Sequence, residues 1–374
     1  MKQKVLFVAH MLRGHVLVFH LPYMKWFQEQ GYEVHLCSCN DTGKPVSEVP
    51  YCDRFFDLPF QRSPFGRQNV HVYREIKKLV DREDYALIHC HTPVGGMVGR
   101  LAARGARKRG TRVLYTAHGF HFFTGAPLRN WLLFYPAERF LARFTDLLIT
   151  INREDEARAR RFPARRVART NGIGVDLSRF EPPADRAAVR AELGIGPDAL
   201  VVICVGEHSA RKNHETVLRA CAGEKVVQVF FSGVGEREDS LKALAAELGM
   251  AERTHFLGFR PDVPALLQAS DVFLFPSLQE GLPMAQMEAM AAGLPCLVSN
   301  VRGNADLIGP MDGGMLRAPM DAEGFRQDLH FLLEHPEVRR EMGERNRRVI
   351  RDYSLDAVLE QMAALYREEL EAKG

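Results

Sequence analysis

The sequence predicts an α/β protein with two domains, each built around a parallel sheet. Its 374 residues exceed the size that a single hydrophobic core usually supports. Short apolar runs alternate with helical segments along the chain, which is typical of parallel strands joined by helices. The alternation is interrupted around 170–183, where Asn171-Gly172 and Pro182-Pro183 favour turns over regular structure. We therefore expect one domain over 1–170 and another over 171–354, with 355–374 packing back on the first.

Strands are expected where short apolar runs precede helical segments. In the first domain they cover 5–9, 33–38, 86–91, 113–117 and 146–151, with helices near 20–30 and 95–109. In the second they cover 200–205, 226–231, 255–257, 272–275 and 296–299. Residues 356–373 predict an amphipathic helix with Leu359, Met362, Leu365 and Tyr366 on its apolar face. Ligands are expected at the carboxyl ends of the strands, in a cleft between the two domains.

The composition is that of a soluble globular protein. No apolar run reaches the roughly 20 residues that a bilayer-spanning helix needs, and residues 1–10 predict a strand rather than a signal peptide. We therefore expect a cytoplasmic protein. Seven cysteines without a CxxC pair predict reduced thiols rather than a zinc site. No Asp-x-Asp motif for Mg²⁺ or Mn²⁺ occurs, and no metal or other cofactor is expected.

Positive charge is concentrated in two segments, 100–112 and 153–169, although the net charge is only +3. These segments are either two solvated helix faces or a basic surface for anionic lipid or a diphosphate-bearing acceptor. Nucleic acid is not expected, because no aromatic residues are interleaved with the charges. The aromatic stretches 120–123 and 131–135 favour buried core over a membrane contact.

The stretch 276–295 carries two glutamates, Glu280 and Glu288, eight positions apart. The preceding apolar run predicts a buried strand, and the Ala- and Met-rich run after Pro283 predicts a helix with this proline in its first turn. Free amides at the start of a helix bind anions, and each carboxylate can accept hydrogen bonds from a pair of hydroxyls. A nucleotide sugar fits such a site. The alternative is an ordinary turn with two solvated glutamates.

Two cations, Arg211 and Lys212, follow the strand at 200–205. They lie beside the phosphate site if this strand neighbours the one at 272–275, and Lys212 can then neutralise a leaving diphosphate. Otherwise they are exposed loop residues. The loop around Gly233 leaves room for a ligand to approach the backbone, although it lacks the third glycine of the dinucleotide fingerprint.

In the first domain, His118 follows the strand at 113–117 and His121 lies in the same loop. A histidine at the carboxyl end of a strand can bond a sugar hydroxyl, or it can be a satisfied structural residue. Gly14, after the first strand, is a candidate for a second phosphate or for the acceptor, together with Arg13 and His15. His89 and His91 share one face of a strand, but no third ligand lies nearby in the sequence, so we do not assign a metal to them.

These motifs resemble those of the retaining GT-B glycosyltransferases of family 4 along essentially the whole chain. The resemblance rests on Glu280 and Glu288, the loop Gly281-Leu282-Pro283, Lys212, 232–235, 256–258, Asn171-Gly172 and His118. The motifs at 14–20, 115–122 and 206–214 are most similar to EpsD-type exopolysaccharide and capsule glycosyltransferases. The resemblance implies two Rossmann-like domains facing a deep cleft, with the C-terminal helix crossing back to the first domain.

The resemblance also implies roles for individual residues. Glu288 would bind the ribose hydroxyls, Glu280 the hydroxyls of the donor sugar, and Lys212, with Arg211, the leaving phosphate. The implied donor site further includes Gly14, Gly233, Gly258, Phe259, Gly281, Leu282, Pro283 and Met284, and the amides of 282–284 would hold the diphosphate. His118 would contact the sugar at its C6 side, while Arg13, His15, His121 and Asn171 are acceptor-side candidates. Transfer would be metal-independent and retain the anomeric configuration, without a protein nucleophile.

Two positions depart from the family pattern. Many relatives place an arginine after the glycine that corresponds to Gly206, where this chain has Glu207, and Arg211 is the candidate replacement. A glycine pair is also common where this chain has Gly14 alone.

The expected function is transfer of a hexose or N-acetylhexosamine from a UDP-sugar to a lipid-diphosphate-linked saccharide in exopolysaccharide or capsule biosynthesis, at the inner face of the cytoplasmic membrane. Two alternatives stay open. One is a UDP-sugar 2-epimerase, which would alter the sugar without an acceptor. The other is a non-catalytic subunit that binds a nucleotide sugar within an assembly complex.

Overall fold

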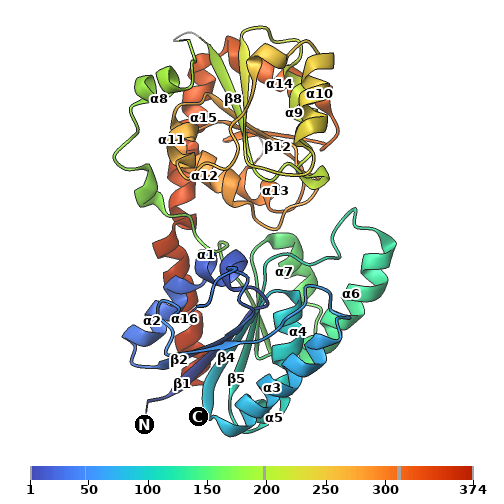
Figure 1. The fold of residues 1–374 in the computed structure, drawn as a ribbon, viewed down its shortest axis with the longest axis vertical. Helices are drawn as coiled ribbons and strands as arrows, with labels where there is room; N and C mark the ends of the chain where they lie inside the picture. The colour runs from blue at the N-terminus through green and yellow to red at the C-terminus, as the bar shows by residue number, and fades with distance from the viewer. Residues whose placement is uncertain (1, 47, 197–198, 310–312, 373–374) are drawn as a thin grey trace. The chain divides into compact units, whose positions relative to one another are not determined.

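In the computed structural model, residues 2–46, 48–196, 199–309 and 313–372 are described. The chain divides into two compact units, 1–173 with 356–374 and 174–355 (Figure 1). The expected boundaries, 170/171 and 354/355, lie within a few residues of these divisions. Among the helices of the described residues, none has both the length and the apolar composition needed to cross a bilayer.

The first unit contains a sheet of seven parallel strands in the order β3-β2-β1-β4-β5-β6-β7. The strands are β1 (Lys4–Val8), β2 (Glu33–Ser38), β3 (Arg54–Asp57), β4 (Tyr85–His91), β5 (Arg112–Ala117), β6 (Leu147–Thr150) and β7 (Arg166–Arg169). The five expected strands are confirmed. The sequence prediction missed β3 and β7, the two edge strands, because they are short, carry charged residues and are only partly buried.

The helical segments of this unit are η1 (Leu12–Val16), α1 (Leu17–Phe19), α2 (Leu21–Glu29), α3 (Gln68–Arg82), α4 (Pro93–Ala102), α5 (Arg104–Lys108), α6 (Leu128–Leu141), η2 (Ala142–Phe144), α7 (Arg153–Ala159) and α16 (Leu355–Glu371). The expected single helix at 95–109 is therefore two helices, α4 and α5. Figure 1 shows α3, α4 and α5 on one side of the sheet and α2 and α16 on the other.

Both faces of this sheet are buried, which explains its continuous apolar strands. Leu6 and Val8 of β1 pack into the core beneath α3 and α4, while Val5 and Phe7 pack into the core beneath α2 and α16. Successive side chains of a strand point to opposite faces, so one strand contributes to two cores. The C-terminal helix belongs to this unit, as expected. Its Tyr366 is fully buried, and the Tyr366 hydroxyl lies 2.8 Å from Nδ1 of His89.

The second unit contains six parallel strands in the order β10-β9-β8-β11-β12-β13. They are β8 (Leu200–Val205), β9 (Val227–Ser232), β10 (Thr254–Phe256), β11 (Val272–Phe275), β12 (Cys296–Ser299) and β13 (Gly314–Arg317). The helical segments are η3 (Leu177–Phe180), α8 (Arg186–Glu192), η4 (Ala210–Lys212), α9 (His214–Cys221), α10 (Glu238–Glu247), η5 (Ala251–Arg253), α11 (Val263–Gln268), α12 (Met284–Ala292), α13 (Asn304–Leu307), α14 (Ala322–Glu334), α15 (Pro336–Val349) and η6 (Ile350–Tyr353). The expected five strands are again confirmed, and the edge strand β13 was missed. Pro283 is the N-cap residue of α12 rather than part of its first turn.

The cations of the two basic segments form many ion pairs within the first unit, but most of them are exposed, as the alternative of solvated helix faces requires; Arg100 is the clearest exception. Arg100 is fully buried, and its Nη2 donates to both carboxylate oxygens of Glu138 at 3.0 Å. Further arginines of these segments form ion pairs with Asp146, Glu154, Glu156, Glu368 and Glu369. All seven cysteines are free thiols, as expected.

Candidate functional site

The residues of the second unit converge because β8 lies beside β11, as the donor-site hypothesis required. Nζ of Lys212 lies 2.7 Å from Oε1 of Glu280, and Nη1 of Arg211 lies 2.9 Å from the same oxygen. The hydroxyl of Ser277 donates to this oxygen at 2.6 Å. Two cations thus share one carboxylate, which leaves the cluster with a positive charge that suits an anionic ligand.

The two cations of this cluster differ in their burial. Lys212 is 9% exposed, and its Nζ lies 4.5 Å from the centre of the Phe275 ring. Burial lowers the pKa of Lys212, while the Glu280 carboxylate opposes this shift. The side chain of Arg211 is 44% exposed. Arg211 can therefore turn toward a ligand at little cost, whereas Lys212 is fixed in place.

Glu288 lies on α12 and is 9% exposed. Its Oε1 accepts a hydrogen bond from Nη1 of Arg179 at 2.9 Å. Burial raises the pKa of Glu288, and the Arg179 guanidinium counteracts part of this rise. Among the described residues, no side chain caps the start of α12, so the amides around Met284 remain available for an anion.

The loops after β9 and β10 reach the same edge of this sheet as the loop after β8, and glycines allow their backbones to come into contact. Gly233 has a φ of +150°, and a Cβ there would lie 2.0 Å from the carbonyl oxygen of Gly206. Its amide donates to the carbonyl of Gly258 at 2.9 Å. Phe259, the next residue, is 81% exposed, and Glu207 is also exposed.

Sequence reasoning missed several residues that support this site. Nε of Arg302 donates to the backbone carbonyl of Glu280 at 3.1 Å. A Cβ at Gly303 would lie 2.4 Å from the carbonyl oxygen of Gly281, so only glycine fits there without a shift of the loop. The sequence could have indicated Gly303 as a site residue, because it follows the expected strand at 296–299. Ser277 and Arg179 gave no comparable signal, because single polar residues in loops are common.

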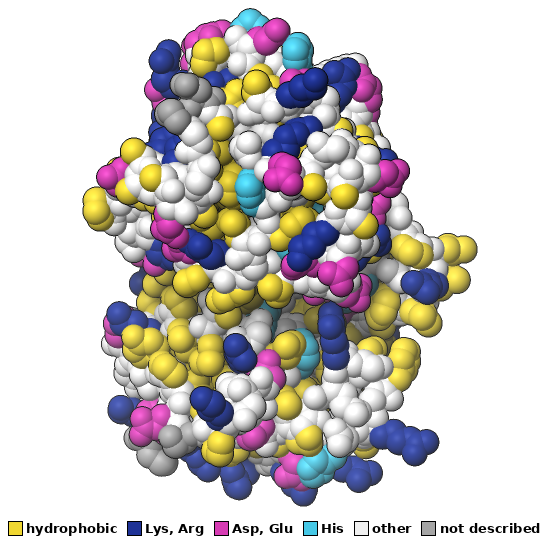
Figure 2. Space-filling view, turned by 45° about the horizontal axis from the view of Figure 1, so that its top comes forward, with side chains coloured by type: hydrophobic (Ala, Val, Ile, Leu, Met, Phe, Trp, Pro, Cys, Tyr) yellow, Lys and Arg dark blue, Asp and Glu magenta, His cyan; other side chains and the backbone are white. Residues whose placement is uncertain are grey.

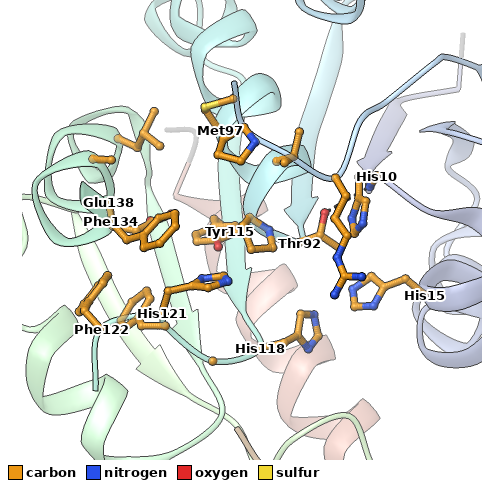
Figure 3. Close-up of a pocket in the computed structure, with 18 residues that line it drawn as sticks. His10, His15, Thr92, Met97, Tyr115, His118, His121, Phe122, Phe134 and Glu138 are labelled. Atoms are coloured by element: carbon orange, nitrogen blue, oxygen red, sulfur yellow. Dashed lines mark hydrogen bonds between the residues drawn. The ribbon is translucent and has the colours of Figure 1, made fainter. Parts of the chain in front are cut away.

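The first unit has a pocket of about 420 Å³ at the carboxyl edge of its sheet (Figure 3). His10, Thr92 and His118 follow β1, β4 and β5, and they line it together with Arg62. Figure 3 shows the rings of His15 and His118 close together at one end of the pocket, and Tyr115, His121 and Phe134 toward the other. Apolar groups predominate in the lining, which also includes Val94, Met97, Phe120, Phe122 and Leu141.

His15 and His118 of this pocket are neutral at physiological pH. Burial lowers the pKa of His118 to about 4. Burial also lowers the pKa of His15 to about 2, and the neighbouring His118 and His10 add to this effect. Neutral imidazoles can donate or accept a single hydrogen bond at each nitrogen, which suits sugar hydroxyls.

The other first-unit candidates do not line this pocket. The amides of Arg13 and Gly14 donate to the carboxylate of Asp41, at 2.6 and 3.2 Å. A phosphate at these amides would meet that carboxylate. The amide of Asn171 donates to Oε1 of Gln361 at 3.0 Å, on α16. Roles for these residues in ligand binding stay predictions.

Two parallel sheets with helices on their faces, together with a cation–carboxylate cluster at the strand ends, fit the GT-B class of glycosyltransferase. Residues 4–152 match the family model described as glycosyl transferase 4-like, and residues 185–349 match that of glycosyl transferases group 1. EpsD of Bacillus subtilis (strain 168), described as a glycosyltransferase, is 40% identical, with 98% of this chain and 97% of that protein covered. This chain therefore belongs to the group 1 glycosyltransferase family, and it is a glycosyltransferase.

Two further proteins are similar. The UDP-Gal:alpha-D-GlcNAc-diphosphoundecaprenol alpha-1,3-galactosyltransferase of Escherichia coli is 32% identical, with 69% of this chain and 70% of that protein covered. The crystal structure of Anabaena Alr3699/HepE in complex with UDP superposes with a TM-score of 0.81 at 19% identity, covering 98% of this chain and 100% of that one. The latter likeness concerns the fold alone.

Proposed function

We propose that this glycosyltransferase moves a hexose or N-acetylhexosamine from a UDP-sugar to a lipid-diphosphate-linked saccharide, in the synthesis of an exopolysaccharide or capsule. The observation that carries the proposal is the similarity to the E. coli galactosyltransferase, whose name specifies a UDP-sugar donor and a lipid-diphosphate acceptor. The B. subtilis relative supports the exopolysaccharide setting through its name, EpsD.

The geometry of the second unit supports a nucleotide-sugar donor. Lys212 and Arg211 present two cations beside the uncapped start of α12, where a diphosphate would find both charge and amides. Glu288, on the same helix, offers a carboxylate to the ribose hydroxyls. Glu280 is assigned to the donor sugar, and it also holds Lys212 in position.

In the proposed mechanism the acceptor hydroxyl attacks the anomeric carbon from the side that the UDP leaves. The bond from the anomeric carbon to the phosphate oxygen breaks, the new glycosidic bond forms, and the acceptor proton passes to the leaving phosphate. The configuration is thereby retained without a protein nucleophile. Lys212 and the amides at the start of α12 stabilise the departing diphosphate, so no metal ion is required for this step. His118 is assigned to the donor sugar.

The direct test supplies the purified protein with UDP-glucose, UDP-galactose, UDP-N-acetylglucosamine and UDP-N-acetylgalactosamine, with and without an undecaprenyl-diphosphate-linked monosaccharide. We expect one donor to extend the acceptor by one sugar in mass spectrometry, with retained anomeric configuration in NMR and an unchanged rate in EDTA. An altered sugar formed without acceptor would instead show the epimerase. Loss of activity in EDTA would contradict metal independence.

The non-catalytic alternative is tested with Lys212→Met. We expect the rate of transfer to fall about 10²- to 10³-fold, as when a single stabilising donor is removed from a transition state. Lys225→Met, at an exposed lysine between α9 and β9, is the matched control and should leave the rate unchanged. If Lys212→Met retains full activity, Lys212 does not assist phosphate departure. If the wild-type protein binds UDP but never extends an acceptor, the protein is a non-catalytic subunit that binds a nucleotide sugar.

We further propose that α6 contacts the membrane surface. Leu128, Leu132 and Leu133 on this helix are 71%, 67% and 53% exposed, so the expected burial of the stretch 131–135 is wrong for its two leucines. Arg129 and Arg139 are exposed on the same helix. Hydrophobic side chains gather with basic ones at the right edge of Figure 2. Apolar insertion next to cations is the pattern of a helix that lies on an anionic bilayer.

A further inference from the structure

Three histidines from separate parts of the first unit meet beside the pocket. His15 lies in η1, His20 lies at the junction of α1 and α2, and His118 follows β5. One ring nitrogen of each lies within 4.8 Å of a ring nitrogen of the other two. The convergence of η1, the α1–α2 junction and β5 results from the sheet order, which places β1 and β5 on either side of β4.

Four of the six ring nitrogens of these histidines lack hydrogen-bond partners among the described residues. His20 is fully buried, and within the described part of the chain neither of its ring nitrogens has a hydrogen-bond partner. The same holds for Nε2 of His15 and Nε2 of His118. Burying an imidazole nitrogen without a partner costs free energy, and such groups call for an explanation such as a bound ion.

The spacing of the rings suits one metal ion. The ring centres lie 4.7 Å apart for His15 and His20, 4.7 Å for His15 and His118, and 5.6 Å for His20 and His118. With metal–nitrogen bonds of about 2.0–2.1 Å and tetrahedral angles, two coordinated imidazoles have centres roughly 5 Å apart.

The remaining features also fit a transition metal. Neutral imidazole is a ligand of Zn²⁺ and of similar ions. His15 and His118 face the pocket, whereas His20 lies behind them, stacked on His91 at 3.7 Å. Three protein ligands with a fourth position open to the pocket match the ligand count of an open zinc site.

We propose that His15, His20 and His118 form a binding site for a divalent transition-metal ion of the zinc type. Zinc bound there would engage His118, the side chain that the proposed function assigns to the donor sugar. Zn²⁺ is therefore expected to inhibit transfer reversibly, and this consequence rests on the proposed function. The binding of Zn²⁺ to the three histidines does not depend on the proposed function.

The test titrates the chelator-treated full-length protein with Zn²⁺ against a competing indicator dye, and with Co²⁺ while its visible spectrum is recorded. We expect one ion per chain and the absorption typical of four-coordinate Co²⁺. His15→Gln and His118→Gln should each weaken Zn²⁺ binding at least tenfold. His71→Gln removes an exposed histidine on α3 and should leave binding unchanged. Unchanged melting temperatures show that the variants are folded.

Substoichiometric binding, or equal affinities of wild type, His15→Gln and His118→Gln, would overturn the proposal. The activity assay separates it from the proposed function. Inhibition by Zn²⁺ that EDTA reverses supports both. Zinc that binds at one equivalent without inhibiting leaves the metal site intact and contradicts the role of His118 in transfer. Failure of zinc to bind, together with loss of transfer in His118→Ala, overturns the metal site alone.

Discussion

The charge of the proposed donor site depends on a few side chains around Glu280. Arg211 and Lys212 share its Oε1, so a bound diphosphate must compete with this carboxylate for both cations. Glu207, exposed just after β8, adds a negative charge to the same edge of the sheet. Position 207 therefore supplies no positive charge for a diphosphate. The second cation beside Lys212 is Arg211.

Glu207→Arg is expected to tighten UDP binding. The change replaces one negative by one positive charge near the proposed diphosphate, and a unit-charge pair at about 4 Å is worth about 1 kcal/mol in water. Calorimetric titration at low salt should show a Kd about tenfold lower, and the gain should shrink as salt is added. Glu247→Arg makes the same charge change at the end of α10, toward the opposite edge of the sheet, and should have little effect. Equal effects of the two variants would mean that Glu207 acts only through net charge.

Glu288 predicts a pH dependence of donor binding. Burial raises its pKa, so Glu288 takes up a proton at a higher pH than an exposed glutamate does. The protonated form cannot accept from two ribose hydroxyls, and affinity should therefore fall as pH drops through this raised pKa. UDP-glucose is the proper probe, because both of its phosphates are diesters that stay ionised over this range. We expect Glu288→Gln to bind UDP-glucose more weakly and with no pH dependence in this window.

The same substitution tests the cost of burying this charge. Because the pKa in the folded state lies above that in the unfolded state, the ionisation of Glu288 lowers stability as pH rises through these values. Glu288→Gln should therefore melt no lower than the wild type at neutral pH. A variant that loses both UDP-glucose binding and several degrees of melting temperature would instead mark Glu288 as a structural residue.

At the scale of elements, the sequence predicted the interior of each sheet well and its edges poorly. Strands such as β8 and β11 are buried on both faces and form uninterrupted apolar runs. The edge strands β3, β7 and β13 lack such runs. For the same reason the sequence placed Lys212 beside the loop that carries Glu280, since both loops follow central strands, although it did not predict their direct contact. The histidine cluster was not, because tertiary packing brings His20 to His118 and no spacing in the sequence reports it.

Helix α6 predicts how membrane binding should respond to mutation. Burying an exposed leucine side chain in the bilayer interface is worth on the order of 1.5–3 kcal/mol, so Leu128→Glu with Leu132→Glu should lower co-sedimentation with anionic vesicles at least tenfold. Binding of the wild type should also weaken in high salt and on neutral vesicles. The control is Val226→Glu with Phe331→Glu, which changes two exposed apolar residues of the second unit. Equal loss in both double variants would rule out α6 as the contact.

At the scale of the whole molecule, the chain has separate hydrophobic cores. One cluster contains only residues of 174–355, and the other two contain only residues of the first unit, including Met362 and Tyr366 of α16. Domains with their own cores can in principle fold alone. The first unit nevertheless requires both ends of the chain, so it is complete only after the second unit has been synthesised.

This organisation predicts that ligands stabilise one unit at a time. Trp26 and Trp131, the only two tryptophans of the chain, both belong to the first unit. Tryptophan fluorescence therefore follows its unfolding, whereas calorimetry records both units. UDP at about 100 times its Kd should add about 2.7 kcal/mol to the stability of the unit that binds it. For a unit of this size that corresponds to a rise in melting temperature of roughly 5–10 °C.

We expect UDP to shift a calorimetric transition while the fluorescence transition stays in place. Zn²⁺ should do the opposite and raise the fluorescence transition, because its proposed ligands lie in the first unit. Lys225→Met keeps the proposed donor site, so UDP should shift its calorimetric transition as much as that of the wild type. The shift should be smaller for Lys212→Met. If UDP raises both transitions equally, the two units unfold as one cooperative body, and the separate cores do not make separate folding units.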